Sequence, residues 1–312
     1  MKNVLFIVLC IIVFVIFINI GKNVGMWKVT NDKYGDLKVK WNDQVGTMYK
    51  DLSYGDKDSN KYDLYLPADK SKKNYSLIFH IHGGGFNSGD KSEGEILMKY
   101  FASKGYVTAS SNYSLMDDTH TSNLNVMYDE LVKALNEVIK EANNKGYNIT
   151  EMAVTGESAG GCLAMLLAFR YENSPIPIKF IFEESGPASF EPSMWADTDK
   201  EGQVSFINSM TGKSFKVEDM ATEEYQNAIN EISPVSYINE NTIPMLLAYG
   251  ANDKIVPPKI KEPLIEALDK YNVPHDYLLL PNSGHGLLGD KDKLLEYHKK
   301  MIEYANKYFE NK

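Results

Sequence analysis

The chain has 312 residues, with 33 lysines and arginines against 42 aspartates and glutamates, so its formal net charge at pH 7 is −9. This acidic balance argues against binding to nucleic acid or to an anionic surface through bulk charge. Its two cysteines, Cys10 and Cys162, are too few for a disulfide framework, and no histidine–cysteine cluster has metal-ligand spacing. We therefore expect no metal and no cofactor.

The N-terminus is predicted to be a separate module. An apolar run from Val4 to Ile20 is interrupted only by Asn19, and seventeen helical residues span about 25 Å, slightly less than a hydrocarbon core. No convincing small-residue cleavage site follows. We predict a membrane anchor over residues 1–21, with a cleaved signal segment as the alternative. Residues 22–47 are predicted to be a tether.

The domain over residues 48–312 has a length typical of one α/β domain. Lysines follow the predicted anchor, on the side that an exported domain would occupy, whereas the positive-inside rule favours lysines on the cytoplasmic side. Long domains, however, translocate largely regardless of such charges. We therefore expect an exported domain that stays attached to the membrane, with a secreted form as the alternative. The oligomeric state is left open.

The first segment that indicates a chemical function is the strand predicted from Ser76 to His82, which is followed by Gly83-Gly84-Gly85-Phe86. Glycines allow the backbone to approach a substrate closely. Acyl transfer requires backbone N–H donors near the oxygen that becomes negatively charged. We assign Gly83, Gly84 or both to such an oxyanion hole. We expect His82 to brace this loop by hydrogen bonding and not to bind metal.

A helix over 94–103 and a strand over 106–111 are expected next, followed by a loop that carries Tyr113. Tyr113 and Phe86 are predicted to line the substrate site. An amphipathic helix is predicted over 124–142, because its apolar residues recur at helical spacing. These residues are Leu124, Met127, Leu131, Leu135 and Val138.

The most informative motif is Gly156-Glu157-Ser158-Ala159-Gly160-Gly161, between a predicted strand over 149–155 and a helix over 159–171. In this context G-x-S-x-G is a nucleophile elbow, in which the serine has a strained backbone and an exposed hydroxyl. The N–H of Ala159 is the predicted second oxyanion donor, at a helix N-terminus that favours negative charge. Glu157 is expected to hydrogen-bond beneath the elbow, to tune the site or to contact substrate.

A strand over 178–184 is followed by nearly sixty residues before the next strand. They are rich in aromatic, methionine and acidic residues and include Trp195. We predict a helical cap over about 187–240, with Trp195 in the substrate site, because loops on a rigid scaffold often carry specificity. A peripheral excursion with its own small core is the alternative.

Two later loops supply an acid and a base. Asp253 follows a predicted strand over 243–250, and His285 follows one over 276–280; helices are expected over 263–271 and 291–308. The chain order Ser, Asp, His is that of α/β-hydrolases. In this interpretation His285 takes the proton from Ser158, and Asp253 orients the imidazole. The alternation of strands and helices predicts a mostly parallel sheet with helices on both faces.

These motifs resemble the α/β-hydrolases of the carboxylesterase and hormone-sensitive-lipase-like group, particularly small bacterial acetyl-xylan and feruloyl esterases. The resemblance is carried by residues 82–86, 156–161, 253–257 and 284–286. It implies a cofactor-free serine esterase for short-chain or carbohydrate-linked acyl esters. Many relatives carry Tyr-Arg-Leu and then a proline-rich acidic stretch where this chain has residues 112–118, which lack the arginine and the prolines. The resemblance therefore does not define the wall of the pocket. The alternatives are a serine peptidase or amidase, and a non-catalytic binding protein; the intact triad argues against the last.

Overall fold

The computed structural model describes residues 32–116, 122–171, 173–195 and 199–310. The predicted anchor over residues 1–21 and the first part of the predicted tether lie outside these ranges. Within the ranges, no helix combines the length and the apolar character that crossing a membrane requires.

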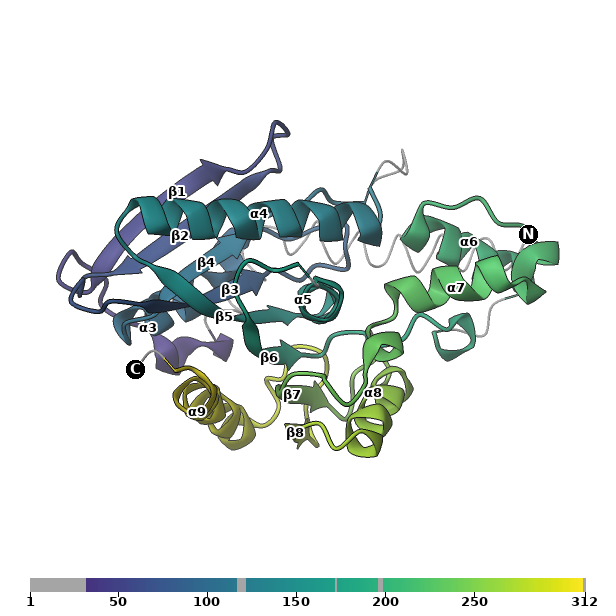
Figure 1. Ribbon diagram of the computed structural model, residues 1–312. Helices are drawn as coiled ribbons and strands as arrows, with labels where there is room; N and C mark the ends of the chain where they lie inside the picture. The colour runs from purple at the N-terminus through teal and green to yellow at the C-terminus, as the bar shows by residue number, and fades with distance from the viewer. Residues whose placement is uncertain (1–31, 117–121, 172, 196–198, 311–312) are drawn as a thin grey trace.

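A single eight-stranded sheet forms the centre of the described chain, in the order β1-β2-β4-β3-β5-β6-β7-β8 (Figure 1). Strand β2 is antiparallel to its neighbours β1 and β4, and the remaining pairs are parallel. The carboxyl ends of β3, β5, β7 and β8 therefore meet at one edge of the sheet. The strands are β1 (Gly46–Ser53), β2 (Lys61–Pro67), β3 (Tyr75–Ile81), β4 (Val107–Ser111), β5 (Ile149–Glu157), β6 (Ile178–Glu184), β7 (Met245–Gly250) and β8 (His275–Leu280).

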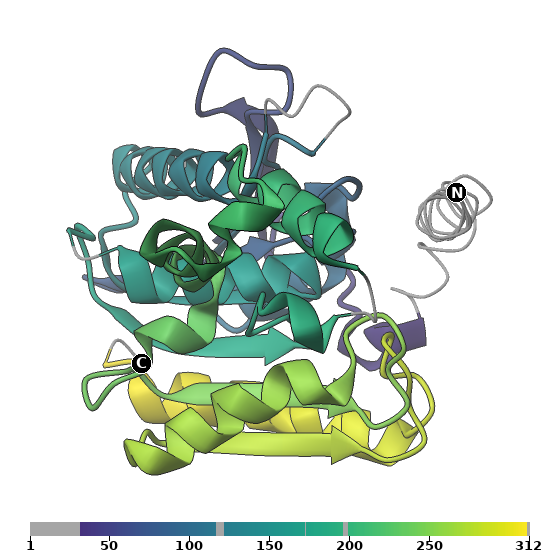
Figure 2. The same cartoon turned by 90° about the vertical axis from the view of Figure 1, so that its right-hand side faces the viewer.

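Helices cover both faces of the sheet, which confirms the predicted α/β class. One face packs against α4 (Leu124–Asn144), α5 (Ala159–Arg170) and α8 (Pro258–Lys270). The other packs against α3 (Glu95–Ser103) and α9 (Lys291–Tyr308). Figure 2 shows α8 and α9 on opposite faces of the strands near the β8 edge.

The strand side chains explain this arrangement. In β6, Ile181 belongs to the core beneath α4 and α5, whereas Phe180 and Phe182 belong to the core beneath α9. Successive side chains of a strand point to opposite faces, and a parallel sheet buried on both faces needs apolar residues at every position. The continuous apolar run in β6 therefore requires helices on both sides.

The predicted cap is helical and has a small core of its own. It contains α6 (Lys200–Thr211) and α7 (Glu223–Ile232), which lie side by side beyond the sheet in Figure 1. Short 3-10 helices precede, join and follow them: η3 (Pro192–Met194), η4 (Val217–Ala221) and η5 (Pro234–Tyr237). The buried apolar side chains between them are Val204, Ile207, Tyr225 and Ile229.

Three features differ from the sequence prediction. Strands β1 and β2 were not predicted. Helix α8 begins at Pro258, where proline suits the first helical position, so the predicted start, Pro263, lies inside the helix. The predicted tether over 22–47 is partly folded onto the domain, since Tyr34 is 2% and Leu37 4% exposed, around a short 3-10 helix η1 (Gly35–Leu37).

Candidate active site

Ser158 lies in a sharp turn between β5 and α5. Its backbone has φ 55° and ψ −122°, a conformation that is strained for a residue with a side chain. A Cβ on Gly160 would lie 2.0 Å from the carbonyl oxygen of Ile81, and one on Gly156 would lie 2.4 Å from the Gly160 carbonyl. Only glycine fits these two positions, so the glycines of the motif serve the turn as the sequence predicts.

Three side chains from three loops form a continuous hydrogen-bonded chain. The Ser158 Oγ lies 2.8 Å from His285 Nε2, and His285 Nδ1 lies 2.7 Å from Asp253 Oδ2. A carboxylate only accepts hydrogen bonds, so the Nδ1 proton of a neutral His285 points to Asp253 and leaves Nε2 to accept from the serine. The three residues sit in the geometry of a serine hydrolase triad.

The loops that carry the acid and the base hold each other in place. Asp253 is 5% exposed, and its Oδ1 accepts the backbone N–H groups of Ile255 at 2.8 Å and Val256 at 2.9 Å. Only Oδ2 is left for the imidazole. A Cβ on Gly250 would lie 2.4 Å from the carbonyl oxygens of Ser283 and Gly284. The two loops therefore pack backbone against backbone.

The glycine loop after β3 approaches the nucleophile. A Cβ on Gly83 would lie 3.3 Å from Ser158 Cβ, and Gly84 has φ +103°. Helix α5 begins at Ala159, whose N–H is among those at a helix start that lack an intrahelical acceptor. The backbone of Gly83 and the start of α5 thus border the space beside Ser158 Oγ.

His82 and Tyr113 support this loop from behind. The Nδ1–H of His82 donates to the Gly83 carbonyl at 2.8 Å, which confirms the bracing role predicted for His82. Tyr113 stacks on the imidazole at 4.4 Å between ring centroids and donates its hydroxyl to the His82 carbonyl at 3.0 Å. Tyr113 is 1% exposed. The prediction that it lines the substrate site is therefore wrong for this structure, because its hydroxyl and ring are both used by the loop.

Phe86 and Trp195 belong to an aromatic cluster that joins the glycine loop to the cap. Phe86 has φ 66° and is 5% exposed; its ring lies 6.1 Å from that of Phe190. Phe190 in turn stacks on Trp195 at 5.6 Å and on Phe206 at 6.1 Å. The cap thus rests directly on the loop beside Ser158, with Trp195 partly exposed.

Glu157 points away from this space. Its carboxylate accepts from the Tyr34 hydroxyl at 3.2 Å and lies 3.7 Å from His80 Nε2. Burial by itself raises the pKa of this carboxyl, but His80, Lys33 and Tyr34 outweigh it and lower the pKa to about 2. The Glu157 carboxylate is thus engaged beneath the elbow, as one of its predicted roles requires.

The residues that meet Glu157 there were not predicted from the sequence. Lys33 and Tyr34 come from the predicted tether, and no periodicity in that segment indicates burial. Glu184 gave a usable signal, because two adjacent glutamates at the end of a buried strand need partners. Ser185 was also missed; its hydroxyl lies 3.3 Å from the His285 carbonyl oxygen.

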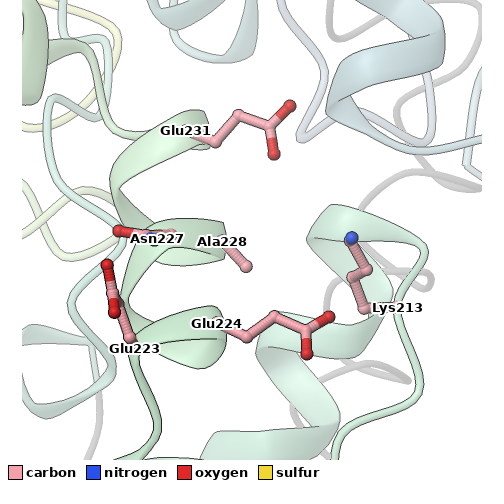
Figure 3. A pocket seen from close by; sticks show the side chains of 6 residues that line it. All are labelled: Lys213, Glu223, Glu224, Asn227, Ala228 and Glu231. Carbon is pink, nitrogen blue, oxygen red and sulfur yellow. The ribbon is translucent and has the colours of Figure 1, made fainter.

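Surface cavities of about 360 to 400 Å³ lie elsewhere on the described chain. The one in Figure 3 lies between Lys213 and α7, and no triad residue lines it. The α7 residues are Glu223, Glu224, Asn227, Ala228 and Glu231. Within the described ranges, no group of three or more histidine, cysteine or acidic residues is placed to hold a metal ion.

Comparison with known proteins places these features in a family. The BD-FAE family profile matches residues 62–268, which is 207 of the 312 residues. Dipeptidyl aminopeptidase BIII of Pseudoxanthomonas mexicana is 24% identical over 67% of this chain. Arylacetamide deacetylase of Bos taurus is 30% identical over 36% of this chain. The chain spans only 30% and 29% of the lengths of these two relatives.

A solved structure described as a truncated form of a carbohydrate esterase from gut microbiota has the same fold. It superimposes with a TM-score of 0.69, covers 86% of this chain and 99% of its own, and is 18% identical. At this identity the likeness concerns the fold and not the substrate.

Proposed function

The chain belongs to the BD-FAE family of α/β-hydrolases, and from this premise we propose that it is a serine carboxylesterase that forms an acyl-enzyme on Ser158. The observation that carries the proposal is the hydrogen-bonded chain Ser158–His285–Asp253, with distances of 2.8 and 2.7 Å, on a strained elbow. A turn of this kind costs conformational energy, and such strain is typical of functional sites.

In the proposed first step, Ser158 Oγ bonds to the ester carbonyl carbon while its proton passes to His285 Nε2. The resulting oxyanion is held by the N–H of Ala159 with that of Gly83, Gly84 or both. As the carbonyl re-forms, the bond to the alcohol oxygen breaks and His285 protonates the departing alkoxide. Asp253 holds the imidazolium in place throughout.

In the second step, water replaces the alcohol. His285 takes a proton from the water as its oxygen attacks the acyl carbon, and then returns a proton to Ser158 Oγ as the carboxylic acid leaves. No cofactor takes part in this scheme.

We propose small-molecule esters with short acyl chains as substrates. No large apolar side chain of the described cap is prominently exposed, unlike the broad apolar lid expected of a lipase. Two exposed apolar side chains lie in the catalytic loops instead: Ile255 is 49% and Leu288 42% exposed. Each methylene adds about 0.8 kcal/mol only while apolar surface remains to receive it. Carbohydrate-linked acetyl or feruloyl esters are the finer form of this proposal.

The test is hydrolysis by wild type and Ser158→Ala of p-nitrophenyl esters of graded length, together with acetylated and feruloylated glycans. We expect kcat/KM to peak between acetyl and butyryl, and Ser158→Ala to be inactive but folded. A value that climbs through octanoyl and decanoyl esters would contradict the short-chain proposal. Residual activity of Ser158→Ala within tenfold of wild type would contradict the serine mechanism.

Peptide hydrolysis is the second candidate, because one of the relatives is a dipeptidyl aminopeptidase. The same triad would then have to protonate an amine leaving group. An aminoacyl p-nitroanilide in the same panel separates the two: turnover of the anilide above that of the esters would favour the peptidase.

We further propose that residues 1–21 anchor the protein and that the catalytic domain faces outward. The support is the apolar run from Val4 to Ile20 in the sequence. Full-length protein should remain with membranes through carbonate and high-salt washes, and protease added to intact cells should digest the domain. A shortened, freely released form would establish a cleaved signal segment instead.

A further inference from the structure

The segment over residues 33–37 passes beneath the nucleophile elbow. On the side of α9, Asp36 accepts a hydrogen bond from His298 Nδ1 at 3.0 Å, and the Tyr34 ring lies 5.5 Å from the same imidazole. On the side of the sheet, the Tyr34 hydroxyl donates to Glu184 at 3.0 Å and to Glu157 at 3.2 Å. The segment therefore links α9 to the strands that carry the active site.

The two glutamates are direct neighbours of the nucleophile. Glu157 precedes Ser158 in the chain and pairs in register with Glu184 on β6. The carbonyl oxygen of Glu184 accepts the backbone N–H of Ser158 at 2.7 Å. Any movement of these two residues would therefore move the backbone of Ser158.

Two carboxylates side by side in a buried site repel each other and lose hydration, so they need compensation. Lys33 forms an ion pair with Glu184, and both side chains are at most 8% exposed. Burial lowers the pKa of Lys33, but the carboxylates outweigh it and raise the pKa, so the ammonium stays charged. Other titratable groups that interact with this cluster include His80, Glu93, Glu183 and Tyr297.

We propose that Lys33 and Tyr34 are positioning residues for Ser158, and that they hold the elbow by joining the carboxylates of Glu157 and Glu184. The inference rests on the proposed role of Ser158 as nucleophile. Lys33 and Tyr34 then belong to the catalytic unit, although the sequence places them in a tether, whereas Asp36 only ties the segment to α9. Their effect reaches the reaction only through the elbow, since neither side chain borders the space beside Ser158 Oγ.

The first test compares kcat and KM of full-length wild type, Tyr34→Phe and Lys33→Met on p-nitrophenyl butyrate, well below their melting temperatures. Tyr34→Phe removes only the hydroxyl, and we expect kcat to fall about tenfold with KM within about twofold. Lys33→Met should have a larger effect on kcat, and Lys33→Arg should restore most of it. The concentration of active sites is measured by titration with a p-nitrophenyl phosphonate, which releases one p-nitrophenol per reactive serine. The value of kcat is then calculated per active site, so that unfolded protein does not contribute.

Asp36→Asn is the matched control. It weakens the same segment at its α9 end without touching the carboxylates, so it should lower the melting temperature and leave kcat unchanged. Wild-type kcat in Tyr34→Phe and Lys33→Met would overturn the proposal. Equal losses of kcat in Asp36→Asn would also overturn it, because the segment would then act only on overall stability.

Charge balance provides a second test. Lys33→Met leaves Glu184 without its cation, whereas the double variant Lys33→Met/Glu184→Gln removes both charges. We expect the double variant to recover kcat relative to Lys33→Met, and losses that simply multiply would contradict the proposal. A wild-type enzyme without esterase activity would instead contradict the proposed function. A double-mutant cycle of Lys33 and Glu184 in urea unfolding would then test their contact itself, and the absence of coupling would refute the proposed link between the segment and Glu184.

Discussion

Replacing His82 by phenylalanine should change how stability depends on pH. His82 is completely buried, and its Nδ1–H donates to the Gly83 carbonyl. Its Nε2 has no hydrogen-bond partner among the described residues. Protonation would therefore place an unpaired N–H and a charge in the core, and burial lowers the pKa of His82 from 6.5 to about 4.

The sign and size of the effect follow from this pKa. Between pH 6.5 and 4 the unfolded chain binds a proton at His82 that the folded protein does not, so stability falls as the pH falls. A difference of about 2.5 pKa units corresponds to roughly 3.4 kcal/mol of unfolding free energy. About 2.5 kcal/mol of this is lost by pH 4.5.

In His82→Phe the ring can still stack on Tyr113, but the hydrogen bond to Gly83 is lost, at a cost of about 1 to 2 kcal/mol at pH 8. The variant lacks the titration, so its stability should exceed that of wild type at pH 4.5. We expect the two curves to cross at about pH 5 to 6. The assay is urea unfolding at 25 °C between pH 8 and 4.5, followed by circular dichroism, with m-values required to match.

Tyr113→Phe is the control. It removes a hydrogen bond to the same loop, at the His82 carbonyl, and burial raises the pKa of Tyr113 well above 10, so it stays neutral over the whole range. Its stability curve should run parallel to that of wild type. If the His82→Phe curve also runs parallel to wild type, the folded protein accommodates a charged His82, and the argument from burial fails.

Three further predictions concern the turn at the nucleophile, the triad and turnover. Gly160→Ala places a Cβ 2.0 Å from the Ile81 carbonyl oxygen and should destabilise the protein by more than about 3 kcal/mol in urea unfolding. The control is Gly35→Ala, which has open space around the new Cβ and should change stability by less than about 0.5 kcal/mol. His285→Ala should lower kcat about 10⁶-fold and Asp253→Asn about 10⁴-fold, because orientation is more easily replaced than a base; equal losses would contradict these roles. EDTA should leave turnover unchanged, because no metal takes part in the proposed scheme; inhibition by EDTA that added zinc reverses would contradict this.

The sequence alone predicted the parallel sheet and the residues that meet at its edge. Its signals were local: glycines that only a tight turn needs, apolar runs of strand length, and polar residues directly after them. Because parallel strands end at the same edge, Ser158, Asp253 and His285 could be brought together without knowing any contact.

Only the tertiary structure decided which side chains support the nucleophile. Tyr34 meets Glu157 and Glu184 across 123 and 150 positions of the chain. Periodicity indicates which face of an element is buried, but not which distant side chain packs against it, since that depends on strand register and on the path of the connecting segments. For the same reason Tyr113, in a loop expected to line the pocket, is turned inward to hold His82, and a segment without any periodic signal lies beneath the active site.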